Sequence, residues 1–321
     1  LITVFLFLWK KYWLAINKGI KTISVGNIVM GGAGKTPHTL FIADELIKKG
    51  EKTAILSLGY KGKIGYDINV ISDGNGNFFH HPPMAADEPY MMASNLPNAV
   101  VITGKKREIS LEIARDKFGA TAAVLDDGYQ YQKLQRDVNI LLLDHKRPIS
   151  TGFPFPFGYL REFPSSISRA DIIVFTRALN DNIPESVKEF IDKQSLYFSN
   201  TVFNRVILKN EVVELKYLKG AVTAAYSGIA NNDVFYHTLQ NAGLDVRFFA
   251  GFADHRMLSE KSINGIITQG RKKGAALFIT TEKDFVKLPQ EYQNIFGYLK
   301  MDIEFNNKDA FIKEIEAAVS K

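Results

Sequence analysis

The sequence predicts an α/β protein with a layered α/β/α domain and a second, smaller α/β domain joined to it by a two-stranded ribbon. Three observations lead to this prediction. Apolar runs without alternation recur along the chain, as in parallel strands that are buried on both faces. Segments with helical signals alternate with these runs. A glycine-rich turn containing Lys35 and Thr36 lies between the first run and the first helix.

The first predicted domain covers residues 21–195. Strands are expected at 21–29, 52–60, 98–104, 120–128, 138–144 and 170–177, and helices at 36–49, 87–94 and 105–118. Gly50 follows the first of these helices, as glycine commonly does at a helix C-terminus. Residues 67–83 contain several Gly, Asn and Pro residues and are expected to form an excursion with a turn. Alternating strands and helices of this kind indicate a parallel, layered domain.

The pattern changes at residues 196–218, where two strand-like runs flank a short polar turn. We expect these runs to form a two-stranded ribbon that links the domains. The second α/β pattern covers residues 219–321, with strands at 221–228, 245–251 and 276–284 and helices at 232–242, 259–273 and 308–320. The 321 residues are enough for two domains of about 100–200 residues each.

Composition limits the class of partner. The formal net charge of +6 suits an anionic partner, but it does not choose among a nucleotide, an acidic lipid and nucleic acid. Because the sequence has no basic stripe and no nucleic-acid-binding motif, we expect no nucleic-acid partner. The lack of cysteine excludes disulfides and thiolate metal sites, and it is compatible with a reducing cytoplasm.

Residues 1–20 are expected to form an amphipathic helix that associates with a membrane surface. The first nine residues are apolar apart from Thr3, and aromatic residues interleaved with lysines follow. The apolar run is shorter than the roughly 20 residues that span a bilayer. Aromatic residues beside lysines suit the headgroup level of a membrane. The alternative is a first helix that packs on the protein's own core.

The stretch SVGNIVMGGAGKTP is a candidate phosphate-binding loop. The usual spacing, G-x-x-x-x-G-K-[ST], would place a glycine where this chain has Val29. Three glycines within residues 31–34 let the backbone approach a phosphate closely and so compensate. Lys35 would reach the outer phosphates and Thr36 would hold Mg²⁺, whereas the alternative is a left-handed turn with an incidental lysine. The candidate nucleotide-binding residues are Gly31, Gly32, Ala33, Gly34, Lys35, Thr36 and Pro37.

Asp126 and Asp127 form a second candidate site. They follow a buried apolar run, and carboxylates at the C-terminal edge of a parallel sheet lie where ligands bind in such folds. One or both would hold Mg²⁺, directly or through water. Asp-Asp-Gly is also a good turn sequence, so the functional interpretation depends on the neighbouring phosphate loop.

Three further stretches allow two interpretations from the residues alone. Asp87 and Glu88 fit the first turn of a helix as well as they fit a catalytic carboxylate. Arg161 would either meet a phosphate or form a surface ion pair. His255 becomes functional only if it faces the site.

Taken in order, these stretches resemble the tetraacyldisaccharide 4'-kinase family, the lipid A 4'-kinases. The resemblance covers residues 24–288 and rests on SVGNIVMGGAGKTP, LSLGYKGK, DEP, VLDDGYQYQKLQRD, PFGYLRE, SGIANNDVF, FADH and TTEKDFVKL. It implies a P-loop-type layered domain, a second α/β domain, and a site in the cleft between them. It also implies an ATP- and Mg²⁺-dependent kinase that phosphorylates the 4'-hydroxyl of a tetraacylated glucosamine disaccharide 1-phosphate in lipid A biosynthesis.

The resemblance implies roles for individual residues. The catalytic residues would be Lys35 of the phosphate loop, Asp87 as the base and His255 as the partner of that base. The metal site would be formed by Thr36, Asp126, Asp127 and Glu162, and the substrate would be bound by Tyr60, Arg161 and Asp127.

The resemblance also implies a location and partners. The protein would lie peripherally on the cytoplasmic face of the inner membrane of a Gram-negative bacterium, held by residues 1–18. Its acceptor would be a lipid A disaccharide 1-phosphate precursor, and no obligate protein partner is evident.

The chain departs from the family pattern at a few positions. Leu58 stands where the family often has Arg, Tyr131 where it often has His, and Arg256 where a second His often follows Asp-His. These departures concern contacts with the lipid and leave the phosphate-binding residues in place. A competing hypothesis is a membrane-associated P-loop nucleotide-switch ATPase. Such proteins commonly carry a lysine immediately before the two glycines, where this chain has Met30.

Overall fold

A computed structural model describes residues 19–59, 67–82, 84–254 and 256–320. Contacts divide the chain into two compact units. Unit 1 ends at Thr201 and resumes at Ile303, and unit 2 covers Val202–Asp302. Residues 1–18 of the predicted N-terminal membrane-associating helix, Tyr60 and His255 lie outside the described residues. Among the helices of the described part, none is long and apolar enough to cross a membrane.

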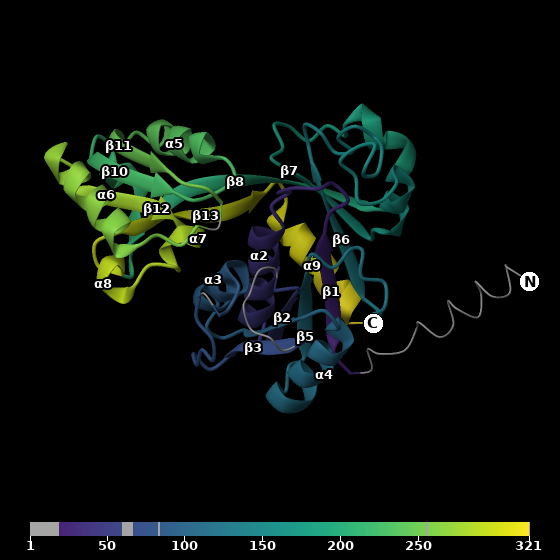
Figure 1. The fold of residues 1–321 in the computed structure, drawn as a ribbon. Helices are drawn as coiled ribbons and strands as arrows, with labels where there is room; N and C mark the ends of the chain where they lie inside the picture. The colour runs from purple at the N-terminus through teal and green to yellow at the C-terminus, as the bar shows by residue number, and fades with distance from the viewer. Residues whose placement is uncertain (1–18, 60–66, 83, 255, 321) are drawn as a thin grey trace, which may run out of the picture. The chain divides into compact units, whose positions relative to one another are not determined.

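Unit 1 is built on a nearly parallel sheet, with the strand order β8-β7-β6-β1-β5-β2-β4-β3 (Figure 1). All neighbouring strands in this order pair parallel, except that β3 pairs antiparallel with β4. The strands are β1 (Lys21–Gly26), β2 (Thr53–Ser57), β3 (Ile68–Asp73), β4 (Val100–Gly104), β5 (Ala122–Asp126), β6 (Val138–Asp144), β7 (Ile172–Thr176) and β8 (Ser195–Leu208).

Helices cover both faces of this sheet, which confirms the predicted layered α/β/α architecture. Alternate residues of β5 show the two faces: Val124 packs in one core with α2, and Leu125 packs in another with α4. The first core includes α2 (Lys35–Lys48), α3 (Asp87–Asn95) and α9 (Lys308–Val319). The opposite face is covered by α4 (Arg107–Phe118) and by the short 3₁₀ helices η1 (Pro164–Arg169) and η2 (Glu185–Phe190).

The strand order changes direction at β1. This strand pairs with β5 on one side and with β6 on the other, and the chain leaves β1 through α2 before it forms β2 on the far side of β5. In parallel α/β sheets the crevice beyond the carboxyl ends of the strands at such a point is the usual ligand position. The glycine-rich loop follows β1 and the Asp126-Asp127 pair ends β5, so the fold brings the two predicted motifs to this point.

Unit 2 contains a second, smaller sheet region with the order β11-β10-β12-β13-β8. Its β10, β11, β12 and β13 form parallel pairs, and β9 pairs antiparallel with β8. The strands are β9 (Glu211–Glu214), β10 (Val222–Ser227), β11 (Asp245–Gly251), β12 (Leu277–Thr281) and β13 (Gly297–Phe305). The helices are η3 (Leu215–Leu218), α5 (Asn232–Asn241), α6 (Glu260–Lys272), α7 (Glu282–Phe285) and α8 (Gln290–Gln293).

The described elements differ from the predicted ones in several places. The predicted strand 276–284 ends at Thr281 and is followed by α7. Residues 67–83, expected as an excursion with a turn, contain the edge strand β3. The predicted ribbon at 196–218 contains the β8–β9 hairpin, but β8 also pairs with β7 along its first half. The strand β13 was not predicted at all, and like β8 it has residues in both units.

The C-terminal helix belongs to unit 1, although the sequence analysis placed residues 219–321 together in the smaller domain. The reason is its apolar face. Phe311 and Ile315 of α9 are buried in the same core as Ile23 and Ile140 of the unit 1 sheet. The Phe305 ring stacks on Phe311, with ring centroids 4.4 Å apart, at the point where the chain enters this helix.

Candidate active site

The glycine-rich loop connects β1 to α2 and leaves the start of the helix open to an anion. Gly34 occupies the N-cap position in the left-handed region, at φ 79°, and Gly31 also has a positive φ of 118°. No side chain caps α2. Backbone N–H groups in the first turn of a helix have no partner within the helix, and the helix dipole favours negative charge there. The geometry therefore suits a phosphate.

Val29 stands where the usual motif has glycine, and a backbone bridge explains why a residue with a side chain fits there. Val29 pairs antiparallel with Leu160, and its carbonyl accepts a hydrogen bond of 2.7 Å from Asn27 Nδ2. The backbone N–H of Met30 donates to the carbonyl of Tyr159 at 2.7 Å. An extended residue in a β-bridge does not need the conformational freedom of glycine. The missing glycine is thus consistent with a phosphate loop that is braced by a second loop.

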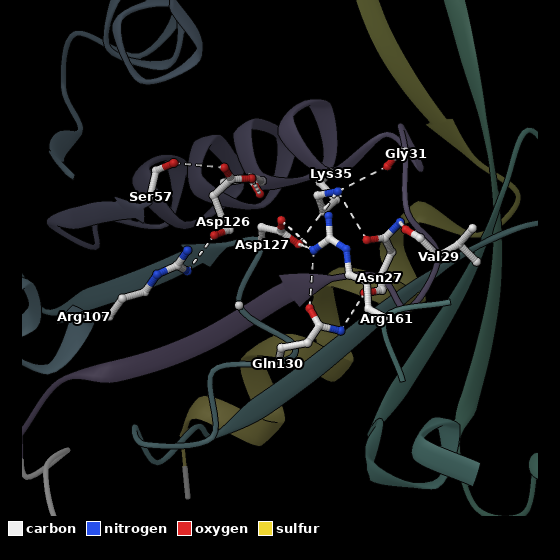
Figure 2. A network of polar contacts seen from close by, with 12 residues as sticks. Asn27, Val29, Gly31, Lys35, Ser57, Arg107, Asp126, Asp127, Gln130 and Arg161 are labelled. Carbon is white, nitrogen blue, oxygen red and sulfur yellow. Dashed lines mark hydrogen bonds and ion pairs between the residues drawn. The ribbon is translucent and has the colours of Figure 1, made fainter. Parts of the chain in front are cut away.

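Lys35 lies at the first position of α2 with its ammonium directed back over the loop (Figure 2). Its Nζ lies 3.2 Å from Asn27 Oδ1 and 3.5 Å from the carbonyl oxygen of Gly31. It also lies 3.8 Å from Asp127 Oδ1. The cation is mostly buried by these neighbours, so it stands fixed between the glycine loop and the acidic pair at the end of β5.

Asp127 connects three segments that are far apart in sequence. Nη1 of Arg161 lies 2.8 Å from each oxygen of the Asp127 carboxylate and donates to both (Figure 2). Gln130 Oε1 accepts from the same nitrogen at 3.5 Å, and Gln130 Nε2 donates to the carbonyl of Asn27 at 2.9 Å. The structure therefore brings Lys35, Asp127 and Arg161 together, as residues of one site.

Asp126 lies beside this cluster but is buried. Its carboxylate accepts hydrogen bonds from Thr39 Oγ1 of α2 and from Ser57 Oγ at the end of β2, each 3.2 Å long. Burial raises the pKa of Asp126 to about 6, although Arg107 opposes this rise and Asp127 and Glu88 add to it. Arg107, itself buried, donates to the backbone carbonyl of Asp126 at 2.6 Å.

Burial, the largest cause of this shift, disfavours the charged carboxylate, which a nearby cation would stabilise. The donor set agrees with a divalent cation, because both neighbouring acidic groups at the end of β5 are carboxylates. Mg²⁺ is usually held by one or two carboxylates together with substrate phosphates. Among the described residues no cluster of three or more His, Cys, Asp or Glu forms a complete metal cage. The adjacent carboxylates Asp126 and Asp127 are therefore donors of the kind that Mg²⁺ takes, and the role of Thr36 as a further ligand stays a prediction.

Asp87 begins α3, and Glu88 and Pro89 follow in the first turn. Ala86 occupies the N-cap position, so no side chain caps this helix, and the two acids lie where the helix dipole favours negative charge. Asp87 is half-buried. These facts agree with the structural interpretation of the stretch, and they are equally compatible with a carboxylate that takes part in chemistry.

Glu162, predicted as a metal ligand, faces a different partner. Its carboxylate accepts a hydrogen bond from Arg169, whose guanidinium lies 4.9 Å from the centre of the Tyr129 ring. The alternative interpretation of Arg161, an ion pair, agrees with the structure: its partner is Asp127, whereas the neighbouring Glu162 pairs with Arg169. The loop turns so that neighbouring residues 161 and 162 point to different partners.

The stretch TTEKDFVKL is a structural element of unit 2. Thr281 caps α7, and Asp284 accepts a 2.8 Å hydrogen bond from the backbone N–H of Gly228. Lys287 Nζ lies 2.7 Å from Asp284 Oδ1, and both side chains are almost fully buried. The same ammonium lies 3.4 Å from the carbonyl oxygen of Arg256. This buried pair therefore fastens two loops of unit 2 to one short helix.

Several site residues were not predicted from the sequence. The structure adds side chains that hydrogen-bond to Lys35, Asp126 or Arg161, namely Asn27, Thr39, Ser57, Arg107 and Gln130. Arg177, at the end of β7, also donates to the carbonyl of Gly32 at 3.0 Å. The only sequence signal for these groups is their position, since Asn27, Ser57 and Arg177 each directly follow or end a buried strand.

Comparison with known proteins agrees with this geometry. A family model described as tetraacyldisaccharide-1-P 4'-kinase matches residues 6–320. The chain belongs to this family. The tetraacyldisaccharide 4'-kinase of Desulfotalea psychrophila is 36% identical over 278 residues, which cover 84% of this chain and 78% of that protein. The corresponding kinase of Geobacter sulfurreducens is 32% identical over 317 residues, which cover 96% of this chain and 88% of that protein.

Tetraacyldisaccharide-1-P 4'-kinases are also represented among solved structures. A crystal structure of LpxK from Aquifex aeolicus in complex with ATP matches this chain with a TM-score of 0.78 and 31% sequence identity. The match covers 99% of this chain and 95% of that one. It confirms the predicted fold class for a member of the tetraacyldisaccharide-1-P 4'-kinase family.

Proposed function

We propose that the chain transfers the γ-phosphoryl group of ATP to the 4'-hydroxyl of a tetraacylated glucosamine disaccharide 1-phosphate, a step of lipid A biosynthesis. Membership of the tetraacyldisaccharide-1-P 4'-kinase family supports this activity along nearly the whole chain. The structural observation that supports this activity most is that Asp127 lies within ion-pair distance of both Lys35, at the end of the glycine loop, and Arg161. The alternative, a nucleotide-switch ATPase, is disfavoured because the family match is to a lipid kinase and includes unit 2.

The phosphate loop binds the triphosphate. Its backbone N–H groups, from Gly31 to Thr36, and the ammonium of Lys35 surround the β- and γ-phosphates. Lys35 then exchanges its contacts with Asn27 and Gly31 for phosphate oxygens. Because charge on these oxygens must be held in place during transfer, a fixed cation lowers the barrier more than a mobile one does.

Thr36, Asp126 and Asp127 would hold Mg²⁺ beside these phosphates. The magnesium ion would supply positive charge that neutralises the phosphate oxygens. The residues of the chain do the positioning: Ser57 and Thr39 orient Asp126, and Arg161 orients Asp127. Glu162 is left out of this set because its carboxylate pairs with Arg169.

The acceptor hydroxyl loses its proton to Asp87. A new bond forms between the 4'-oxygen and the γ-phosphorus, the bond from that phosphorus to the β,γ-bridging oxygen breaks, and ADP leaves. The proton of the hydroxyl passes to the Asp87 carboxylate. The position of Asp87 in the first turn of α3 supports this role, since it presents a half-buried carboxylate on unit 1. His255 and Tyr60 keep the roles that the resemblance implies, as partner of the base and as substrate contact.

The acceptor carries four acyl chains, so we propose that the protein works at the cytoplasmic face of the inner membrane as a peripheral protein. Residues 1–18 support this location, because aromatic residues interleaved with lysines suit the headgroup level of a bilayer.

The direct test is to incubate the protein with ATP labelled at the γ-phosphate and a lipid A disaccharide 1-phosphate precursor, and to locate the new phosphate by NMR. Phosphate at the 4'-position that forms only when the acceptor is present supports the proposal. ATP hydrolysis at the same rate with and without the acceptor would instead support a nucleotide switch. A Lys35→Met variant controls for contaminating kinases, since it removes the ammonium and keeps most of the side-chain volume.

A further inference from the structure

An aromatic loop stands out on the surface of unit 1. We define the aromatic loop as residues 151–163, TGFPFPFGYLREF. Its side chains Phe153, Phe155, Phe157, Tyr159 and Phe163 are all more than 60% exposed, and Phe157 is 87% exposed. Single exposed apolar residues are normal, but five aromatic side chains in thirteen residues form an apolar patch of the kind that marks an interaction surface.

The backbone of the loop forms a tight, hydrogen-bonded turn that presents these rings. The N–H of Phe155 donates to the carbonyl of Leu160 at 2.9 Å, and the N–H of Leu160 donates to the carbonyl of Phe153 at 3.1 Å. Between them a tight turn has the N–H groups of Phe157 and Gly158 donating to the carbonyl of Pro154. A Cβ at Gly158 would lie only 2.3 Å from the carbonyl oxygen of Phe153. These contacts hold the backbone of the tip in a tight turn, and the rings that it carries are exposed.

Two cations lie just before the loop, and the charged residues within it, Arg161 and Glu162, pair with Asp127 and Arg169. Residues 145–160 contain Lys146 and Arg147 and no aspartate or glutamate. Both cations are exposed. Aromatic rings beside cations are typical of protein surfaces that enter the headgroup region of an anionic bilayer, where the rings lie at the interface and the cations meet lipid phosphates. A second copy of this chain is a poorer partner, because the same cations would face each other.

The loop is continuous with the candidate active site. Tyr159 accepts from the N–H of Met30, and the N–H of Arg161 donates to the carbonyl of Ile28 at 2.7 Å. The last residues of the loop therefore form a bridge with the phosphate loop, and Arg161 turns from that bridge toward Asp127. Any surface that binds the aromatic tip lies a few residues of rigid backbone away from the phosphate-binding groups.

We propose that the aromatic loop is a membrane contact of unit 1, whose rings enter the interface of an anionic phospholipid bilayer. This inference rests on the proposed function only in that an acylated acceptor is found in a membrane. The contact is separate from the one proposed for residues 1–18. It would hold the phosphate loop close to the bilayer surface, where the sugar of an acylated acceptor is presented.

The test uses the absence of cysteine in the full chain, which allows one probe to be attached at one chosen site. Phe157→Cys carries an environment-sensitive nitrobenzoxadiazole label, and Lys117→Cys, on the exposed side of α4, carries the same label as the matched control. Both proteins are mixed with vesicles of phosphatidylethanolamine and phosphatidylglycerol, without ATP or acceptor. We expect the label at 157 to shift to the blue, to brighten at least about twofold, and to be quenched by lipids with a spin label near the headgroup. The label at 117 should not change.

A second measurement removes rings instead of adding a probe. In the full chain, Phe155→Ser with Phe157→Ser should weaken vesicle binding about tenfold or more, because two aromatic side chains lose their apolar environment. Both side chains are exposed, so thermal unfolding should be unchanged. An unchanged emission at 157 in the presence of vesicles would overturn the proposal. A shift that appears only when a tetraacylated disaccharide is added would also overturn it, and would assign the loop to the acyl chains of the acceptor.

These outcomes are distinguishable from failure of the proposed function. The vesicle measurements contain neither nucleotide nor acceptor, so they read membrane contact alone. If the loop inserts into vesicles but no phosphate is transferred, the membrane contact is supported and the kinase activity is not. If the acceptor is phosphorylated in detergent but the loop does not enter vesicles, the kinase activity is supported and the membrane contact is not.

Discussion

Nη1 of Arg161 lies 2.8 Å from both carboxylate oxygens of Asp127, although the two residues are 34 positions apart in the chain. The pair joins the turn after β5 to the loop that braces the phosphate-binding segment. Both side chains are about 30% exposed. An ion pair at this exposure stabilises a fold by less than about 1 kcal/mol, so its value lies in the orientation of the carboxylate.

Replacing Arg161 should therefore damage catalysis far more than folding. We expect Arg161→Ala to lower kcat/KM for phosphoryl transfer by about a hundredfold, because it removes a cation next to Asp127 and Lys35. The free energy of unfolding should fall by less than about 1 kcal/mol in urea titrations. Arg115→Ala is the matched control, since Arg115 forms a comparable ion pair with Asp116 on α4. A large loss of stability with proportionate loss of activity would mean that the pair is structural.

Asp87 offers the clearest test of the chemical step. Asp87→Asn keeps the shape of the side chain and removes its capacity to accept a proton, so turnover should fall by about 10²- to 10⁴-fold. Binding of a fluorescent ATP analogue should be unchanged within about twofold, because the phosphate loop is intact. Glu88→Gln, one position along α3, is the control and should retain turnover within about tenfold.

The same experiment separates the base from its predicted partner. His255→Ala should lower turnover less than Asp87→Asn does, because it removes an orienting group and leaves the proton acceptor. If Asp87→Asn lost nucleotide binding in proportion to turnover, Asp87 would be a nucleotide-binding or structural residue and the proposed mechanism would be wrong.

The sequence alone predicted what depends on local pattern. Buried parallel strands such as β6 and β7 were recognised within two residues at each end, because runs such as VNILLLD have no polar face. The strands that were missed are different. β3 is a half-buried edge strand among turn residues, and in β13 apolar residues, of which Met301 is exposed, alternate with Lys300, Asp302 and Glu304. Their place in the sheet depends on neighbours that are distant in the chain.

The site divides in the same way. Lys35 and the glycine loop were predicted because one short segment contains the whole motif. The partners of Asp127 and Glu162 were not predicted. Arg161 pairs with Asp127, and Arg169 pairs with Glu162, only after the loop has folded. Adjacent residues in an irregular loop can face opposite directions, and no periodic pattern in the sequence indicates the direction of each side chain.

The buried pair Asp284–Lys287 should matter for the stability of unit 2. We expect Lys287→Met to destabilise the protein by about 3–5 kcal/mol in urea unfolding, because it leaves the Asp284 carboxylate buried without its cation. The double variant Asp284→Asn with Lys287→Met should recover part of this loss, since no charge then remains unpaired. Lys216→Met, which removes an exposed ion pair with Glu214, is the control and should unfold like the parent. Equal losses in the single and double variants would contradict this account.

Two buried groups near the start of α2 should give the stability an unusual dependence on pH. Burial lowers the pKa of His38 from 6.5 to about 4, although a hydrogen bond to the carbonyl of Gly34 opposes the shift. Between these two pKa values the unfolded chain binds a proton that the folded chain does not. The contribution of His38 to stability is therefore lost as the pH falls through this window, by up to about 1.4 kcal/mol per pH unit.

Asp126 acts in the opposite direction, because burial raises its pKa from 3.8 to about 6. Between these values the folded chain binds a proton that the unfolded chain has released, so this contribution to stability grows as the pH falls. In the parent protein the two slopes offset each other from about pH 6 to pH 4. Without magnesium, Asp126→Asn should therefore lose stability over this range more steeply than the parent, and His38→Gln should do the reverse. Urea titrations in EDTA at half-unit intervals of pH would show this divergence, whereas parallel curves for the three proteins would mean that neither group carries its shifted pKa in the folded state.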